Sequence, residues 1–191
     1  MFEVEAPLIA RSRKAGHFVI VRVDEMGERL PLTIADADTS RGTITLVIQK
    51  VGLSSTKICD LEVGEYLLDI VGPLGNATHI ENYGTVLCAS GGVGTAPLLP
   101  IVKALKAAGN KVISVLAGRT KELIILEEEV RKSSDEVIIM TDDGSYGTKG
   151  LVTEGIEKVA KMMLLGKMPD EQITAYTGLT QEQINSLKNQ A

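Results

Sequence analysis

The stretch Val86-Leu-Cys-Ala-Ser-Gly-Gly-Val-Gly-Thr-Ala-Pro97 joins an apolar run to three closely spaced glycines and a proline. The run predicts a strand, and apolar residues at helical spacing beyond Pro97 predict a helix that ends at Gly109. A glycine turn between a strand and a helix presents backbone N–H groups to a phosphate at the positive end of the helix dipole. The stretch therefore indicates a phosphate-binding turn, with a purely structural turn as the alternative.

The residues beyond this helix predict an α/β unit. We expect a strand at 111–117, a helix at 122–132 and a strand at 136–141. Alternating strands and helices favour a parallel sheet with the glycine turn at its carboxyl edge. The spacing of Gly91, Gly92 and Gly94 differs from G-x-G-x-x-G, so the ribose-binding acid of the ordinary dinucleotide fingerprint is not assumed.

Three runs with β-branched alternation, at 17–23, 42–49 and 66–71, are separated by glycine-containing turns and predict a small antiparallel β-barrel. We place this barrel at 1–82, a truncated Rossmann-like α/β domain at 83–153, and a short helical tail at 154–191. The tail predicts two short helices with a capping box at Thr180 and Gln183. Their expected inward positions are Ile173, Tyr176, Ile184 and Leu187.

Composition narrows the classes of partner. The chain has 191 residues, a formal net charge of −5 and 3% aromatic residues, which argues against nucleic acid as a general partner. Cys59 and Cys88 stand in apolar stretches of sequence, which indicates reduced thiols that pack in the core rather than a disulfide. The start Met-Phe-Glu-Val-Glu is acidic where a signal peptide is basic, and no apolar run approaches ~18 residues. We expect a cytoplasmic protein that does not bind a membrane.

A β-barrel followed by an α/β unit with Gly-Gly-Val-Gly-x-Ala-Pro resembles the ferredoxin–NADP reductase superfamily. Within it, residues 1–153 resemble the electron-transfer subunit of dihydroorotate dehydrogenase and the alpha subunit of ferredoxin:NADP oxidoreductase. The resemblance implies a barrel that binds FAD and an α/β domain that binds NAD(P)H. It further implies hydride transfer to the flavin, and electrons passed to a redox partner subunit or iron–sulfur protein.

The motif Arg29-Leu30-Pro31-Leu32-Thr33-Ile34 carries the flavin part of the resemblance. In the family, an arginine here neutralises the flavin diphosphate, which suits a bidentate guanidinium. Thr33 stands where a hydroxyl hydrogen-bonds the flavin N5, so it is the candidate catalytic residue. Pro31 replaces a tyrosine common in relatives, and Leu32 completes the motif. The alternative is a surface arginine on an edge strand.

Two further groups of residues follow from the resemblance. The segment 51–56 resembles the turn that completes the flavin diphosphate site, and its candidates are Gly52, Ser54, Ser55 and Thr56. For the nicotinamide dinucleotide the candidates are Gly91, Gly92, Val93, Gly94, Thr95, Arg119, Asp142 and Asp143. For the 51–56 segment the alternative is a simple loop. Arg119 as a loop cap and the two aspartates as ordinary turn chemistry are the corresponding alternatives for the second group.

The resemblance stops near residues 150–153. Relatives continue with a four-cysteine segment for a [2Fe–2S] cluster, and Cys59 and Cys88 cannot supply four thiolates. We therefore expect no such cluster and no metal site on this chain. The tail is similar to the helical tail of some transposase-associated nucleases, although no nuclease core is visible. Its charges from 156 to 191 cancel, which favours a helical cap over an unfinished sheet rather than DNA recognition.

These observations predict an electron-transfer flavoprotein that moves a hydride from NAD(P)H to FAD. The alternatives are a non-catalytic remnant that binds flavin or nucleotide, and an interaction or DNA-binding module led by the tail. The choice between NADH and NADPH stays open. A truncated sheet exposes an edge, so an oligomer is possible.

Overall fold

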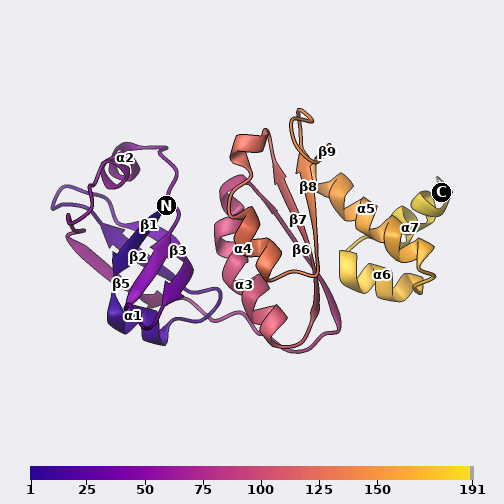
Figure 1. Cartoon of the computed structure of the whole chain (residues 1–191), viewed down its shortest axis with the longest axis horizontal. Helices are drawn as coiled ribbons and strands as arrows, with labels where there is room; N and C mark the ends of the chain where they lie inside the picture. The colour runs from indigo at the N-terminus through magenta and orange to yellow at the C-terminus, as the bar shows by residue number, and fades with distance from the viewer. Residues whose placement is uncertain (190–191) are drawn as a thin grey trace. The chain divides into compact units, whose positions relative to one another are not determined.

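The computed structural model describes residues 1–189 and divides into two compact units (Figure 1). The first unit comprises Met1–Ile80 and Ala96–Ala104, and the second comprises Glu81–Thr95 and the residues from Leu105 onward. The boundaries that we placed at 82 and 153 remain predictions. The last two residues of the predicted tail, 190 and 191, lie outside the described residues.

The first unit is built on an antiparallel sheet, as predicted. Its strands are β1 (Phe2–Glu5), β2 (Phe18–Arg22), β3 (Leu30–Asp38), β4 (Thr43–Leu46) and β5 (Asp69–Leu74). They lie in the order β1-β4-β3-β2-β5, so the sheet is a half-barrel with β1 and β5 at its edges. The helices α1 (Pro7–Ser12) and α2 (Leu53–Cys59) add Ile9, Ala10 and Ile58 to its core.

Period-two alternation places the core residues of this half-barrel. Val19 and Val21 of β2, and Ile44 and Leu46 of β4, are fully buried and form one cluster. The strand predicted at 66–71 is displaced and begins only at Asp69. A local turn precedes this segment, in which the backbone N–H of Glu62 donates to the carboxylate of Glu65 at 2.7 Å.

The second unit contains the predicted parallel sheet. Its strands β6 (Thr85–Gly91), β7 (Lys111–Gly118), β8 (Glu136–Thr141) and β9 (Thr148–Lys149) pair in chain order. The glycine turn is a single 3-10 turn at Gly92–Gly94, and α3 (Thr95–Ala107) follows directly. The helix therefore begins two residues before Pro97, which lies in the first turn, where its missing N–H has no intrahelical partner to lose.

The helix predicted at 122–132 is only partly present. A 3-10 turn at Lys121–Leu123 is followed by α4 (Glu127–Lys132). Leu126 between them has φ of 56°, a left-handed conformation that a helix cannot continue through. The pattern of carboxylates and apolar residues predicts one continuous helix, whereas the structure interrupts it at Leu126.

The tail folds against the parallel sheet. It forms α5 (Val152–Leu165), α6 (Asp170–Thr177) and α7 (Gln181–Lys188), which lie on the opposite face of the sheet from α4 (Figure 1). The predicted inward residues Ile173, Ile184 and Leu187 are buried, and Tyr176 packs beside them. The capping box at Thr180 and Gln183 is confirmed. The tail is therefore a cap over one sheet face.

Gly155 explains how α5 comes so close to the sheet. A Cβ added there would lie 2.6 Å from Val115 Cγ1 and 2.9 Å from Met140 Cγ.

Within residues 1–189, no helix is long and apolar enough to cross a bilayer.

Candidate functional site

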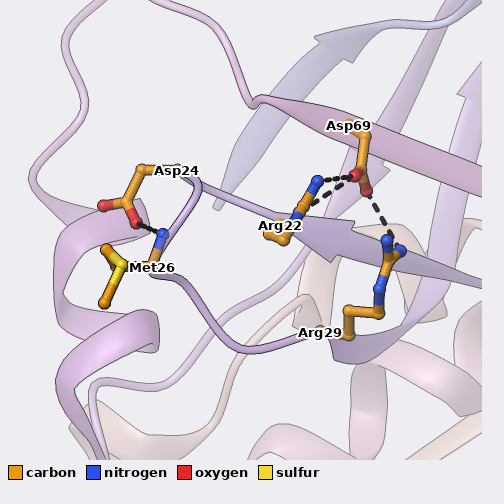
Figure 2. Close-up of polar contacts among 5 residues, drawn as sticks. All are labelled: Arg22, Asp24, Met26, Arg29 and Asp69. Atoms are coloured by element: carbon orange, nitrogen blue, oxygen red, sulfur yellow. Dashed lines mark hydrogen bonds and ion pairs between the residues drawn. The ribbon is translucent and has the colours of Figure 1, made fainter.

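Arg29 lies just before β3 and is half exposed. Its Nη1 lies 3.5 Å from Asp69 Oδ1 on β5 (Figure 2). The other oxygen of Asp69 accepts from Arg22 of β2, at 3.0 Å from Nε and 2.9 Å from Nη2. Two guanidinium groups therefore share one carboxylate, and Arg29 has the looser contact. These three side chains together carry a formal charge of +1.

The loop that carries Arg29 is fastened to α2. Lys57 of α2 donates to Asp24 at 2.6 Å, and this hydrogen bond lowers the pKa of the Asp24 carboxyl below its ordinary value. The backbone N–H of Glu28 donates to Ser54 Oγ at 3.2 Å, and Ser54 Oγ donates to Glu28 Oε2 at 3.2 Å. The structure thus brings together Arg29 and the 51–56 segment, the two parts of the predicted diphosphate site.

The 51–56 segment is a helix start rather than the predicted turn. Gly52 is the N-cap of α2, and Ser54 and Ser55 lie in its first turn. Ser55 Oγ accepts from the backbone N–H groups of Val51 and Gly52 and donates to the Gly52 carbonyl. The side chains of Ser54 and Ser55 are buried, and their hydroxyls already form hydrogen bonds within the protein. To a diphosphate, the segment therefore offers backbone N–H groups rather than these hydroxyls. Thr56 is half-buried.

The first half of β3 has an unpaired edge. Residues Leu30–Thr33 pair with β2, whereas β4 pairs with β3 only from Ile34 onward in the described sheet. Ile34 N–H donates to the His17 carbonyl at 3.2 Å, so by antiparallel alternation the backbone groups of Pro31 and Thr33 point away from β2. Pro31, which lacks an N–H, stands where β2 requires no donor. Pro31 is exposed, and Leu32 and Thr33 are half-buried.

The glycine turn is open where a ligand would approach it. A Cβ added to Gly92 or Gly94 would meet nothing within 4 Å, and Gly92 has φ of 51°. Packing therefore gives no reason for the absence of a side chain at Gly94. Behind the turn, the buried hydroxyls of Ser90 and Thr95 lie 3.0 Å apart and hold the strand to the helix start. Gly91 and Val93 are exposed.

Three loops meet at the carboxyl edge of the parallel sheet. Gly91 pairs in register with Ala117, and Gly118 pairs with Thr141, so each loop leaves the sheet at the same level. The loops after β7 and β8 are joined by hydrogen bonds from Asp142 N–H to the Gly118 carbonyl at 3.1 Å and from Asp143 N–H to the Arg119 carbonyl at 3.3 Å. The structure therefore gathers the second predicted group of residues at one edge.

The side chains at this edge differ in exposure and in their hydrogen bonds to the protein. Arg119 and Asp142 are exposed. Asp143 Oδ1 accepts from both the N–H and the hydroxyl of Ser145, and the hydroxyl contact, at 2.6 Å, is the main cause of the lowered pKa of Asp143. Asp143 thus has a turn-forming role in this structure, which was the alternative drawn from the sequence. Whether it also contacts a ribose stays a prediction.

Sequence reasoning missed Asp69 and Glu28, which contact the two parts of the first site. Asp69 is 40 residues from Arg29, and no local pattern links them. Glu28 precedes the arginine of the motif directly and gave no sign that it would reach Ser54. Within residues 1–189, no group of three or more His, Cys, Asp and Glu side chains is arranged to hold a metal ion.

The chain is similar to several known proteins. No protein-family model matches the chain. Over 158 residues it is 45% identical to the dihydroorotate dehydrogenase B (NAD(+)) electron transfer subunit homolog of Thermotoga maritima, covering 83% of this chain and 56% of that protein. It is 35% identical over 156 residues to the electron transfer subunit of Bacillus caldolyticus, covering 78% of this chain and 60% of the relative. The chain thus spans less than two thirds of either relative.

Solved structures show the same fold. An NADH-dependent reduced ferredoxin-NADP oxidoreductase, solved in connection with flavin-based electron bifurcation, is 43% identical with a TM-score of 0.78. That match covers 83% of this chain and 57% of the other. A cytochrome P450 reductase of Amycolatopsis is 20% identical with a TM-score of 0.65, and the match covers 77% of this chain and 49% of the reductase chain. This match supports the fold alone.

Proposed function

Because the chain is homologous to the electron transfer subunits of dihydroorotate dehydrogenase B, we propose that it is a flavin-dependent oxidoreductase module. It binds FAD on the half-barrel and NAD(P)H at the carboxyl edge of the parallel sheet, and it serves an iron–sulfur partner subunit. FAD, when bound, supplies the chemistry: it accepts a hydride from the nicotinamide and releases electrons one at a time.

The observation that carries this proposal is the unpaired edge of β3 beside Arg29. A planar heterocycle with donors and acceptors on its rim needs backbone and hydroxyl groups that are not already paired, and Pro31 and Thr33 direct such groups away from β2. Thr33 adds a hydroxyl that both donates and accepts. Arg29 provides the positive charge for a diphosphate at the start of the same strand.

The dinucleotide half of the proposal is supported by the glycine turn. The open space at Gly92 and Gly94 lets a diphosphate approach the backbone at the start of α3, a helix of 13 residues with its positive dipole end there. Arg119, exposed on the loop after β7, is the candidate for contact with the adenosine ribose. Asp142, exposed on the loop after β8, is a candidate for binding ribose hydroxyls. We propose no iron–sulfur cluster on this chain, so its electrons leave through a partner.

The test is reduction under anaerobic conditions. The chain is loaded with FAD and mixed with NADH or with NADPH, and the flavin absorption in the blue is followed. We expect one of the two dinucleotides to reduce the flavin, so that its absorption in the blue decreases after mixing. A yellow protein that neither dinucleotide bleaches, although dithionite does, would contradict hydride transfer.

That second outcome would favour a flavin-binding protein without hydride transfer. One observation supports this candidate: among the described residues, the last strand of the parallel sheet, β9, has only two residues. The tail as a DNA-binding module has less support, because its inward face is buried on the sheet and Lys188 is paired with Asp170 at 2.6 Å.

A further inference from the structure

Two loops of the second unit leave the carboxyl edge of the parallel sheet together. The loop after β7 begins at Arg119, and the loop after β8 comprises residues 142–147. Two backbone hydrogen bonds join their bases, from Asp142 N–H to the Gly118 carbonyl and from Asp143 N–H to the Arg119 carbonyl. The backbone of Arg119 is therefore held on one side, while its side chain is exposed.

A third hydrogen bond joins the two loops, two residues beyond Arg119, and its acceptor is a side chain. The backbone N–H of Lys121 donates to Ser145 Oγ at 2.9 Å. Ser145 Oγ donates in turn to Asp143 Oδ1 at 2.6 Å, so its proton is directed to the carboxylate and a lone pair faces Lys121. The backbone from Arg119 to Lys121 is thus bonded at both of its ends to the loop after β8.

Tyr146, the neighbour of Ser145, contacts the same lysine. Lys121 Nζ lies 5.3 Å from the centre of the Tyr146 ring, a distance at which an aromatic face attracts an ammonium group. The Tyr146 hydroxyl donates to Glu127 Oε1 at 3.0 Å, and Arg131 Nε donates to the same oxygen at 2.7 Å. The ring is therefore fixed to α4, and Lys121 is contacted at both its backbone and its side chain.

The first unit contains the same turn without a bond to a second loop. Ser40 donates to Asp38 Oδ1 from its N–H at 2.8 Å and from its hydroxyl at 2.6 Å. Ser145 donates to Asp143 Oδ1 in the same way, at 2.9 and 2.6 Å. Within the described residues, the Ser40 hydroxyl bonds to no second loop. The turn itself therefore does not require the additional bond that Ser145 forms with Lys121.

We propose that Ser145 is a positioning residue for the nicotinamide dinucleotide. Through the backbone of Lys121, it holds Arg119 where the guanidinium contacts the adenosine ribose. The inference rests on the proposed function, in which Arg119 is the candidate for that contact. A loop that is ordered before binding loses less conformational entropy when the ligand binds, so the Ser145–Lys121 bond raises affinity without touching the dinucleotide.

The first test compares Ser145→Ala with Ser145→Thr and Ser40→Ala. Each chain is loaded with FAD and assayed with ferricyanide as electron acceptor and with the dinucleotide that reduces the unmodified chain. Because one hydrogen bond is lost, we expect Ser145→Ala to raise the KM about three- to tenfold and to keep kcat within about twofold. Ser145→Thr keeps a hydroxyl and should restore the original KM, and Ser40→Ala should not change it. An unchanged KM in Ser145→Ala would overturn the proposal.

A double-mutant cycle tests whether Ser145 acts through Arg119. Arg119→Gln should raise the KM by itself, because it removes the proposed ribose contact. If the Ser145–Lys121 bond serves to hold Arg119, adding Ser145→Ala to Arg119→Gln should raise the KM further by less than about twofold. Effects of the two substitutions that multiply fully would contradict the positioning role.

Hydrogen exchange of the Lys121 amide provides a readout that needs no activity. We expect Ser145→Ala to speed exchange of this amide about tenfold, because its protein acceptor is replaced by water. In Ser145→Thr and Ser40→Ala the rate should match that of the unmodified chain. Equal exchange in Ser145→Ala and the unmodified chain would show that the bond does not order the loop, and would overturn the proposal.

Failure of the inference and failure of the proposed function give different results. If neither NADH nor NADPH reduces the unmodified chain loaded with FAD, the proposed function is wrong and the inference fails with it. If the unmodified chain is reduced and Ser145→Ala has the same KM, only the inference is wrong.

Discussion

Arg29 Nη1 lies 3.5 Å from Asp69 Oδ1, whereas Arg22 contacts the same carboxylate at 2.9 and 3.0 Å (Figure 2). The two contacts are unequal in a way that matters for binding an anion. If Arg29 turns to a diphosphate, Asp69 keeps Arg22 as its partner, so no carboxylate is left uncompensated. We therefore expect Arg29 to be the exchangeable member of this cluster and Asp69 to compete with a bound diphosphate for it.

The first prediction concerns that competition. Asp69→Asn removes the negative charge beside Arg29, so we expect FAD to bind about two- to fivefold more tightly, with a steeper dependence on salt. Isothermal titration at two salt concentrations measures both. The control is Asp60→Asn, which removes an exposed carboxylate paired with Lys50 instead. Weaker binding in Asp69→Asn alone would show that Asp69 holds Arg29 for the ligand rather than competing with it.

The glycine turn provides the second prediction. In Gly94→Ala the new methyl group meets no protein atom within 4 Å, so we expect unfolding by denaturant to be little changed. The same methyl group occupies the space proposed for the dinucleotide diphosphate, so the apparent KM for NADH or NADPH should rise about tenfold or more. Gly166→Ala, on the tail, serves as the control. A variant with unchanged kinetics would place the dinucleotide elsewhere.

Cys88 allows a prediction about pH. Burial raises the pKa of its thiol from 9.0 to about 11. The folded chain therefore holds this proton more tightly than the unfolded chain, and the thiol's contribution to stability is complete below pH 9 and is lost as the pH rises towards 11. At pH 9.0, we expect iodoacetamide to label Cys88 in Cys59→Ser far more slowly than Cys59 in Cys88→Ser. Equal labelling rates would contradict the buried, protonated thiol.

The tail carries the fourth prediction. Ile184 is fully buried in the cluster that covers the parallel sheet, so Ile184→Ala should lower the free energy of unfolding by about 2–5 kcal/mol. Leu165→Ala is the matched control, because Leu165 is 78% exposed and its truncation removes little packing. Urea unfolding followed by circular dichroism compares the two. A tail that is not docked on the sheet would lose no more stability from Ile184→Ala than from Leu165→Ala.

The sequence predicted those features that depend on local pattern. The strand at 136–141 is β8 to the residue, and the inward positions Ile173, Ile184 and Leu187 are buried. Both follow from the periodicity of apolar residues. The capping box at Thr180 is likewise a local signal, since its partners are three residues apart.

Features that depend on backbone exceptions or distant partners were missed. The left-handed conformation of Leu126 broke an expected helix, although leucine favours helices and marks no break. The segment 51–56 is the start of α2 rather than the predicted turn, because serine and glycine are typical of turns as well as of helix starts. The sharing of Asp69 by Arg22 and Arg29 joins residues from three places in the chain, which only the sheet brings together.

The most direct test of the central claim, that Arg29 and the free edge of β3 bind FAD, is a titration of the colourless chain with FAD, followed by flavin fluorescence. The account predicts saturable binding to one site, weakened tenfold or more in Arg29→Gln, because a charge-assisted hydrogen bond is worth about 1.5–3 kcal/mol. Arg11→Gln, an exposed position on α1, should bind like the original chain. No binding at excess FAD, or equal binding by Arg29→Gln and Arg11→Gln, would contradict it.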